Sequence, residues 1–199
     1  MKKLLAIGLL SLFIGGQAQA GFIKSVTGAD MAGIEVTVTY DDATTDSAIW
    51  GATFPEEGAA NGADWGLYEQ GDTIGGDNGQ FLYGVWTFTR STNAIKNIAS
   101  LFIDTSTTNI VFDTEFFDVS ANGSGAGREF TYDDKAHDPV TALFSGLYMD
   151  ELYTGLTISG PGLVDGFQFM IDTDEVPAPT TLSIMLLALG GLVARRLKA

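Results

Sequence analysis

The sequence contains no cysteine and a single histidine in 199 residues. A chain without cysteine has no disulfide bond, no thiol nucleophile and no cysteine-ligated metal, so its stability must come from packing. The histidine, His137, stands in a polar stretch, and no nucleophile-elbow pattern supplies a serine for it to activate. His137 is therefore expected on the surface of an acidic loop, and the sequence indicates no catalytic triad.

Positive charge is scarce between the two ends of the chain. The sequence has 25 Asp and Glu against 10 Lys and Arg, and five of these basic residues stand in the first three and last five positions. Between Gly21 and Glu175 the other five face all 25 acidic residues, which gives this part a formal charge of −20. A surface this acidic repels nucleic acid and anionic lipid head groups and attracts cations. Nucleic-acid binding is therefore excluded as a function.

Two long apolar runs stand at the ends of the chain. At the N-terminus, Lys2 and Lys3 precede an apolar run from Leu4 to Ile14, and small residues follow at alternate positions. This order is that of a secretory signal peptide. We predict a signal peptide at residues 1–20, cleaved at the site formed by Ala18 and Ala20.

The C-terminal run, residues 180–194, predicts a single transmembrane helix. Its 15 residues span about 22 Å as a helix, less than the roughly 30 Å of a bilayer's hydrocarbon core, so the span is short. Pro177 and Pro179 keep the approach to this segment extended, because proline fixes φ and disfavours helix in the residue before it. The basic end, residues 195–199, is expected to stay in the cytoplasm by the positive-inside rule.

Between the signal peptide and the C-terminal tail, residues 175–199, one all-β domain is predicted for residues 21–174. From Ile34 to Tyr40, large apolar and polar residues alternate strictly, which places them on opposite faces of a strand. Turn formers separate about eight to ten short segments, a pattern typical of an antiparallel β-sandwich or jelly roll. The other strand segments are residues 81–89, 98–105, 153–159 and 166–171, and the turn formers are residues 41–42, 75–79, 122–127 and 160–162.

Two local patterns refine this prediction. Asn78-Gly79 directly before an apolar segment indicates a hairpin, because both residues tolerate positive φ. Residues 93–101 have apolar positions at helical spacing, so a helix is the alternative to a strand in this segment. The apolar run continues through Phe102 and Ile103, so a strand is preferred for the second half of this segment.

Clustered oxygen ligands on loops make calcium the metal that the sequence favours. Calcium accepts carboxylate and amide oxygens with flexible geometry. Neither of two acidic loops matches an EF-hand, and the alternative is that both are simply solvated. No other cofactor is predicted. The candidate ligands are Asp72, Asp77 and Asn78 in one loop and Asp133, Asp134 and Asp138 in the other.

Two hypotheses concern carbohydrate. Paired carboxylates for glycoside hydrolysis are available from Glu115, Glu129 or Glu151, but with 25 acidic residues such pairs arise without function, and we predict that the chain is not an enzyme. Trp65 lies in a glycine-containing stretch and is predicted to be the most exposed tryptophan ring, able to stack on a sugar. The alternative is that Trp65 is buried, as aromatic side chains commonly are.

The last part of the chain has three components in order: a proline motif, an apolar segment and a basic end. The motif consists of Val176, Pro177, Ala178 and Pro179, and the basic end begins with Arg195 and Arg196. This ending resembles the PEP-CTERM sorting signal of exosortase substrates in Gram-negative bacteria. The resemblance implies processing near the prolines by an exosortase-type enzyme, during transient insertion in the inner membrane, and then export to the cell surface or beyond. Ala178 stands where that family has its name-giving glutamate, which leaves the exosortase subtype open.

The body of the chain is also similar to that of some PEP-CTERM proteins, in the stretches "VTGADMAGIEVTVTY" and "LYTGLTISG". Proteins of this kind are associated with extracellular polysaccharide and biofilm. The resemblance therefore implies an exported structural or adhesive protein of the cell envelope or extracellular matrix, with exopolysaccharide as a partner. The alternative is a carbohydrate-binding module, and a polysaccharide-active enzyme is the third hypothesis.

Overall fold

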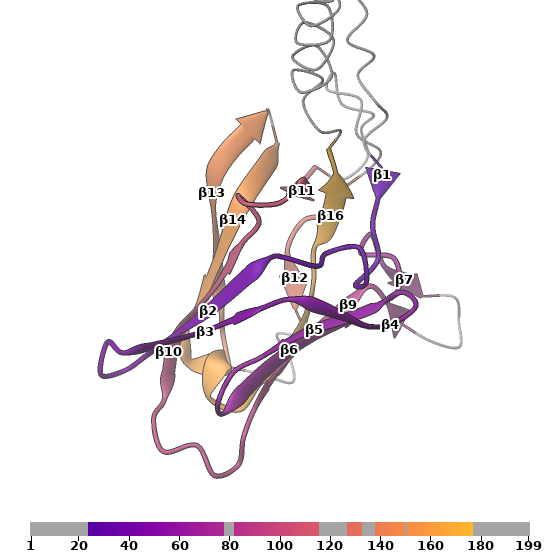
Figure 1. Ribbon diagram of the computed structural model, residues 1–199. Helices are drawn as coiled ribbons and strands as arrows, with labels where there is room; N and C mark the ends of the chain where they lie inside the picture. Colours follow the sequence, from indigo (N-terminus) through magenta and orange to yellow (C-terminus); the bar gives the residue numbers. More distant parts are fainter. Residues whose placement is uncertain (1–23, 78–81, 116–126, 133–137, 150, 177–199) are drawn as a thin grey trace, which may run out of the picture. The chain divides into compact units, whose positions relative to one another are not determined.

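The computed structural model describes residues 24–77, 82–115, 127–132, 138–149 and 151–176 (Figure 1). These residues belong to one compact unit, Phe22–Val176. The predicted signal peptide, transmembrane segment, basic end and processing prolines lie outside the described residues. Within the described ranges, no helix has the length and apolar character needed to cross a membrane.

The larger of two main antiparallel sheets contains eight strands and branches at β14 into two arms. Strand β14 pairs along one edge with β13, and along the other with β10 and then β11, which follow each other in the chain. Beyond β10 the sheet continues to β2 and β3, and beyond β11 it continues to β16 and β1. The bounds are β1 Lys24–Ser25, β2 Glu35–Tyr40, β3 Thr45–Ile49, β10 Ile98–Asp104, β11 Ile110–Asp113, β13 Thr141–Met149, β14 Leu152–Ser159 and β16 Asp172–Glu175.

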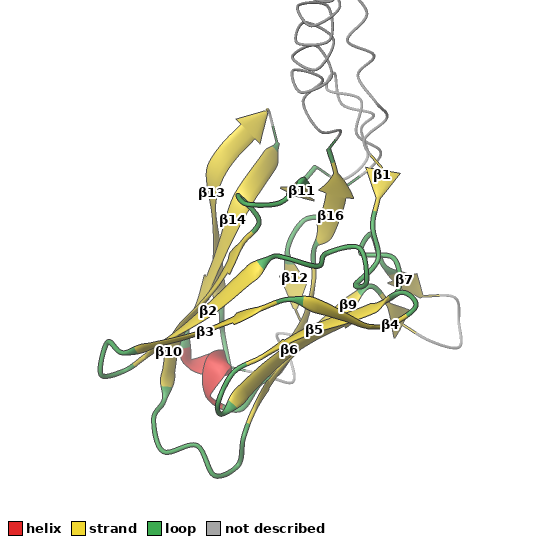
Figure 2. Cartoon of the chain, in the orientation of Figure 1, coloured by secondary structure: helices red, strands yellow, loops and turns green. Residues whose placement is uncertain are grey.

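The smaller sheet has six strands in the order β12-β15-β9-β6-β5-β4. Figure 2 shows the described chain as strands and loops with one short helix, η1 (Pro161–Val164). Strands β7 (Gly76–Asp77) and β8 (Leu82–Tyr83) form a separate pair. The strands of the smaller sheet are β4 Gly51–Phe54, β5 Glu57–Asn61, β6 Trp65–Gln70, β9 Val85–Arg90, β12 Thr131–Tyr132 and β15 Phe167–Met170.

The prediction of an all-β, antiparallel domain is confirmed, because all pairings among the described strands are antiparallel. Strands β2, β10, β14 and β15 match predicted segments closely, and Ile98–Asp104 is a strand and not the rival helix. The hairpin predicted at Asn78-Gly79 has β7 and β8 paired on either side of it, with residues 78–81 outside the described part. Gly76–Asp77, predicted as part of a turn, are instead the strand β7.

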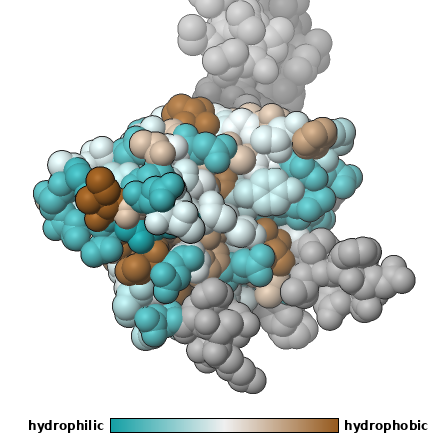
Figure 3. All heavy atoms as spheres, turned by 90° about the horizontal axis from the view of Figure 1, so that it is seen from below, coloured by the Kyte–Doolittle hydropathy of each residue, from teal (hydrophilic) through white to brown (hydrophobic). Residues whose placement is uncertain are grey.

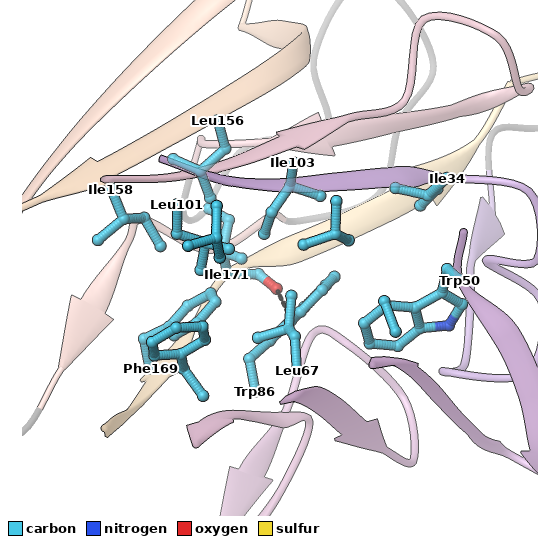
Figure 4. Close-up of a cluster of buried hydrophobic side chains, with 14 of the residues drawn as sticks. Ile34, Trp50, Leu67, Trp86, Leu101, Ile103, Leu156, Ile158, Phe169 and Ile171 are labelled. Atoms are coloured by element: carbon cyan, nitrogen blue, oxygen red, sulfur yellow. Dashed lines mark hydrogen bonds between the residues drawn. The ribbon is translucent and has the colours of Figure 1, made fainter. Parts of the chain in front are cut away.

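One hydrophobic core joins the two sheets. Strand alternation turns Val36 and Val38 of β2 inward, where they are fully buried. Figure 4 shows Leu101, Ile103, Leu156 and Ile158 of the larger sheet facing Leu67, Trp86 and Phe169 of the smaller one. The Trp86 indole stacks on Phe169 at 5.7 Å between ring centroids and donates to Ile171 O at 3.2 Å. Each such large buried side chain stabilises the fold by about 1.5–3 kcal/mol.

Gly58 of β5 is expected to tolerate no side chain. A Cβ there would lie 2.1 Å from Gly28 O and 2.2 Å from Trp50 Nε1, which itself donates to Gly28 O at 2.7 Å. Gly58→Ala must therefore displace backbone and a buried indole, at a cost of about 2–3 kcal/mol, or roughly 5–10 °C in Tm. Gly51→Ala in β4 is the matched control, because no atom lies within 4 Å of its added Cβ. Equal Tm values for the two variants in thermal denaturation would contradict this packing.

Candidate functional sites: an end pocket and a buried carboxylate cluster

A pocket of about 600 Å³ lies where three loops meet at one end of the sheets. The loops are the β2–β3 turn, the β5–β6 connection and the β9–β10 loop, and the last of these is the lowest part of the domain in Figure 1. Figure 3 looks at this side from below and shows a mostly hydrophilic surface with separate hydrophobic patches. The pocket is lined mainly by polar side chains, among them Tyr40, Asp46, Asp64, Asn93 and Lys96.

Two aspartates are held in the pocket wall by neutral donors. The Tyr40 hydroxyl donates to Asp64 Oδ1 at 2.5 Å, and burial together with this hydrogen bond raises the pKa of Tyr40 well above its usual range. Asp46 Oδ2 accepts from Ala63 N and from Trp65 Nε1, both at 2.8 Å. These bonds fix the direction of both carboxylates and use one oxygen of each. The second oxygens accept no hydrogen bond from the described part of the chain, so they can accept one from a ligand hydroxyl.

Trp65 does not provide an exposed ring, so that part of the sugar-stacking hypothesis is wrong. Its side chain is 4% exposed and belongs to the core. A Cβ at Gly62 would lie 2.1 Å from Trp65 Nε1, so the nearby glycine makes room for the buried indole. Trp65 nevertheless supports the pocket wall, because its indole N–H donates to Asp46 Oδ2.

Cationic side chains hold the β9–β10 loop in place. Arg90 donates to three backbone carbonyls, those of Ala94 at 3.1 Å, Lys96 at 2.7 Å and Val164 at 3.1 Å. Lys96 Nζ lies 2.8 Å from Asp42 Oδ2, and this contact lowers the pKa of Asp42 to about 2. The pocket wall therefore keeps its shape through interactions among its own loops.

A second site is a cluster of three buried carboxylates in the larger sheet. Asp113 of β11 lies opposite Asp172 of β16, and Asp174 follows two residues later, which puts all three on one side of the sheet. One carboxylate oxygen from each lies within 4.8 Å of the others. The Thr73 hydroxyl donates to Asp172 Oδ1 at 2.9 Å. The structure thus gathers acidic groups that lie far apart in the sequence.

Burial is the main reason why these carboxyl groups hold protons tightly. It raises the pKa of Asp172 to about 8, with a further contribution from the charge of Asp174. Burial likewise raises the pKa of Asp174 to about 7, with Asp113 contributing next. The cluster therefore carries less than its full negative charge near neutral pH unless a cation compensates it.

Sequence reasoning placed one of its metal candidates near this cluster and missed the cluster itself. Exposed Asp72 directly precedes Thr73, and its charge helps to raise the pKa values of Asp172 and Asp174. Asp77 lies in β7 and Asp138 is exposed before β13. Candidates Asn78, Asp133 and Asp134 lie outside the described residues. The signal available in the sequence was the alternation of Asp172 and Asp174 directly after an apolar segment.

The carboxylates considered for glycoside hydrolysis have different surroundings. Glu115 and Glu129 are exposed, Glu151 is half-buried, and His137 lies outside the described residues.

No protein-family model, curated protein or solved structure matches the chain.

Proposed function

We propose that this chain is an exported structural or adhesive protein of the cell envelope or extracellular matrix, processed by an exosortase-type enzyme. The proposal rests on the proline motif, apolar segment and basic end of the sequence, and the pairing of the first and last described strands supports it. Lys24 of β1 lies opposite Glu175 of β16, and Ser25 lies opposite Asp174. The two ends of the described domain are therefore paired with each other, and they lie between the predicted cleavage site after Ala20 and the proline motif in the sequence.

The packing around Val176 supports removal of the tail from a completed domain. Val176 N donates to Asn109 O at 2.7 Å, and its side chain packs with Val111 and Leu152. Loss of the residues before Gly21 and after the proline motif removes none of the described strands. The test is fractionation of producing cells: the mature protein is expected outside the inner membrane without its basic end.

Carbohydrate binding is the second candidate function, and the end pocket favours it. Carboxylates held in fixed directions beside hydroxyl and amide groups suit the hydroxyls of a sugar, and the pocket's size suits a small ligand. The formal charge of −20 between Gly21 and Glu175 disfavours an anionic glycan. The ligand class is therefore a neutral polysaccharide.

A neutral glucan such as dextran is the probe for this pocket. Asn93→Ala combined with Ile95→Ala removes an amide and an apolar contact from exposed positions on the rim, so affinity should fall at least about fivefold without loss of folding. Ile49→Ala is the matched control, because Ile49 is also exposed, at 62% against 96% for Ile95, and does not line the pocket. Affinity electrophoresis of the full chain measures the change. Equal binding by all three proteins, or none by the wild type, would reject this second function.

A further inference from the structure

The three buried aspartates have the spacing of a cation site. Their ligand oxygens lie within 4.8 Å of one another, and two of the residues come from β16 while the third comes from its neighbour β11. Calcium accepts carboxylate oxygens with flexible geometry, whereas magnesium demands near-ideal octahedral geometry and usually keeps several of its waters. A buried set of three carboxylates therefore suits calcium better than magnesium.

Asp174 supplies the second indication that something binds here. Its side chain is 2% exposed, and its Oδ2 atom is buried without a hydrogen-bond partner among the described residues. A buried carboxylate oxygen left without a donor is costly unless it is protonated or bound to a cation. The cluster therefore requires a compensating proton or ion beside Asp174.

Three cationic side chains whose surroundings the structure describes bind other groups. Arg90 binds backbone carbonyl oxygens, Lys96 binds an acidic side chain of the β2–β3 turn, and Arg128 contacts a methionine sulfur. The Thr73 hydroxyl donates to Asp172 Oδ1 and the Glu115 N–H donates to Asp113 Oδ1 at 3.1 Å, and neither bond reaches Asp174 Oδ2. A metal ion is then the natural partner for a set of hard oxygen ligands in so acidic a domain.

We propose that Asp113, Asp172 and Asp174 bind one calcium ion. The ion joins β11 to β16, the strand that leads into the predicted proline motif. Calcium thus stabilises the end of the domain from which the sorting tail continues. The site differs from the loops that the sequence suggested, although Asp72 lies close enough for its charge to act on the cluster.

The experiment uses the full chain in mild detergent, stripped of metal by a chelator and then given calcium or magnesium chloride alone at about 2 mM. Calcium is expected to raise Tm by at least about 5 °C, and magnesium by less than about 1 °C, because a ligand bound only to the native state stabilises it. Calorimetry should find one calcium per chain. Asp172→Asn and Asp174→Asn should each reduce the calcium-induced shift to less than about a fifth.

Asp138→Asn is the matched control, since it removes an exposed aspartate of a predicted calcium loop, and it should keep the full shift. Asparagine has the shape of aspartate and removes a buried charge, so both test variants are expected to fold. If they do not, Asp113→Asn on the other strand replaces them. Equal shifts with both ions, no bound calcium, or a full shift in the test variants would overturn the proposal and leave a proton shared within the cluster.

Discussion

Raising the pH from 5 to 8 is expected to destabilise the domain, and replacing Glu69 by Gln is expected to remove a large part of that loss. Glu69 lies on β6 with its side chain fully buried, and neither carboxyl oxygen has a hydrogen-bond partner among the described residues. Burial first, and then the charge of Asp72, raise its pKa from 4.5 to about 9. The nearby Gly28 N–H donates to Gly71 O, and it lowers the pKa of Glu69 by less than burial and Asp72 raise it.

The sign follows from proton binding. The folded protein holds the Glu69 proton more tightly than the unfolded chain does, so its contribution to stability is complete below pH 4.5 and is lost as the pH rises towards 9. Between pH 5 and 8 this single proton lowers the free energy of unfolding by about 1.4 kcal/mol per pH unit, on the order of 4 kcal/mol in total. This corresponds to on the order of 10 °C in Tm.

Thermal denaturation of the full chain in detergent at pH 5 and pH 8 measures the effect. Glu69→Gln cannot titrate and should be about as stable as the wild type at pH 5 but markedly more stable at pH 8. The carboxylate cluster contributes equally to both proteins, so their difference isolates Glu69. Glu35→Gln, at an exposed position of β2, is the control and should follow the wild type. Parallel losses in the wild type and Glu69→Gln would refute a buried, protonated Glu69.

The second large effect concerns the fate of the tail in producing cells. The acidic domain is expected to cross the inner membrane while the basic end resists crossing, so the chain pauses as an intermediate with one span. Replacing Arg195, Arg196 and Lys198 by Asn removes this stop. Unprocessed protein should then appear in the soluble periplasm, in place of the processed form.

The proline motif is expected to act at the next step. Pro177→Ala with Pro179→Ala allows the segment outside the bilayer to become helical, because proline no longer fixes it in an extended form. Insertion should persist, but the chain should stay in the membrane with its basic end attached. Wild-type processing of either variant, seen by fractionation and mass spectrometry, would show that these residues do not direct sorting.

Much of the fold follows from strand alternation in the sequence. Ile34 to Tyr40 could be predicted because its apolar side chains face a core that spans both sheets. Strands β3, β4 and β5 could not, since their segments are short and rich in small or polar residues. They are strands because they pair with neighbours, which a local pattern does not reveal.

The candidate sites were harder to predict because they depend on contacts between distant residues. Asp113 meets Asp172 only through the register of β11 with β16. Glycine near Trp65 suggests an exposed ring, whereas Gly62 allows the indole to pack and to hydrogen-bond Asp46. Tyr40 was predicted as part of a strand, but its hydroxyl reaches Asp64 of another loop. Side-chain identity suggested chemistry in each case, and only the fold determined the partners.

The intact mass of the protein recovered outside the inner membrane tests the proposed function most directly. The account predicts a chain that begins at Gly21 and ends near Pro177 to Pro179, with Arg195, Arg196 and Lys198 absent. The compact domain should be retained whole, since β16 ends at Glu175 and Val176 packs against it. A mass that still includes Lys198 and Ala199, wherever the protein resides, would show that the tail is only an anchor and would contradict the account.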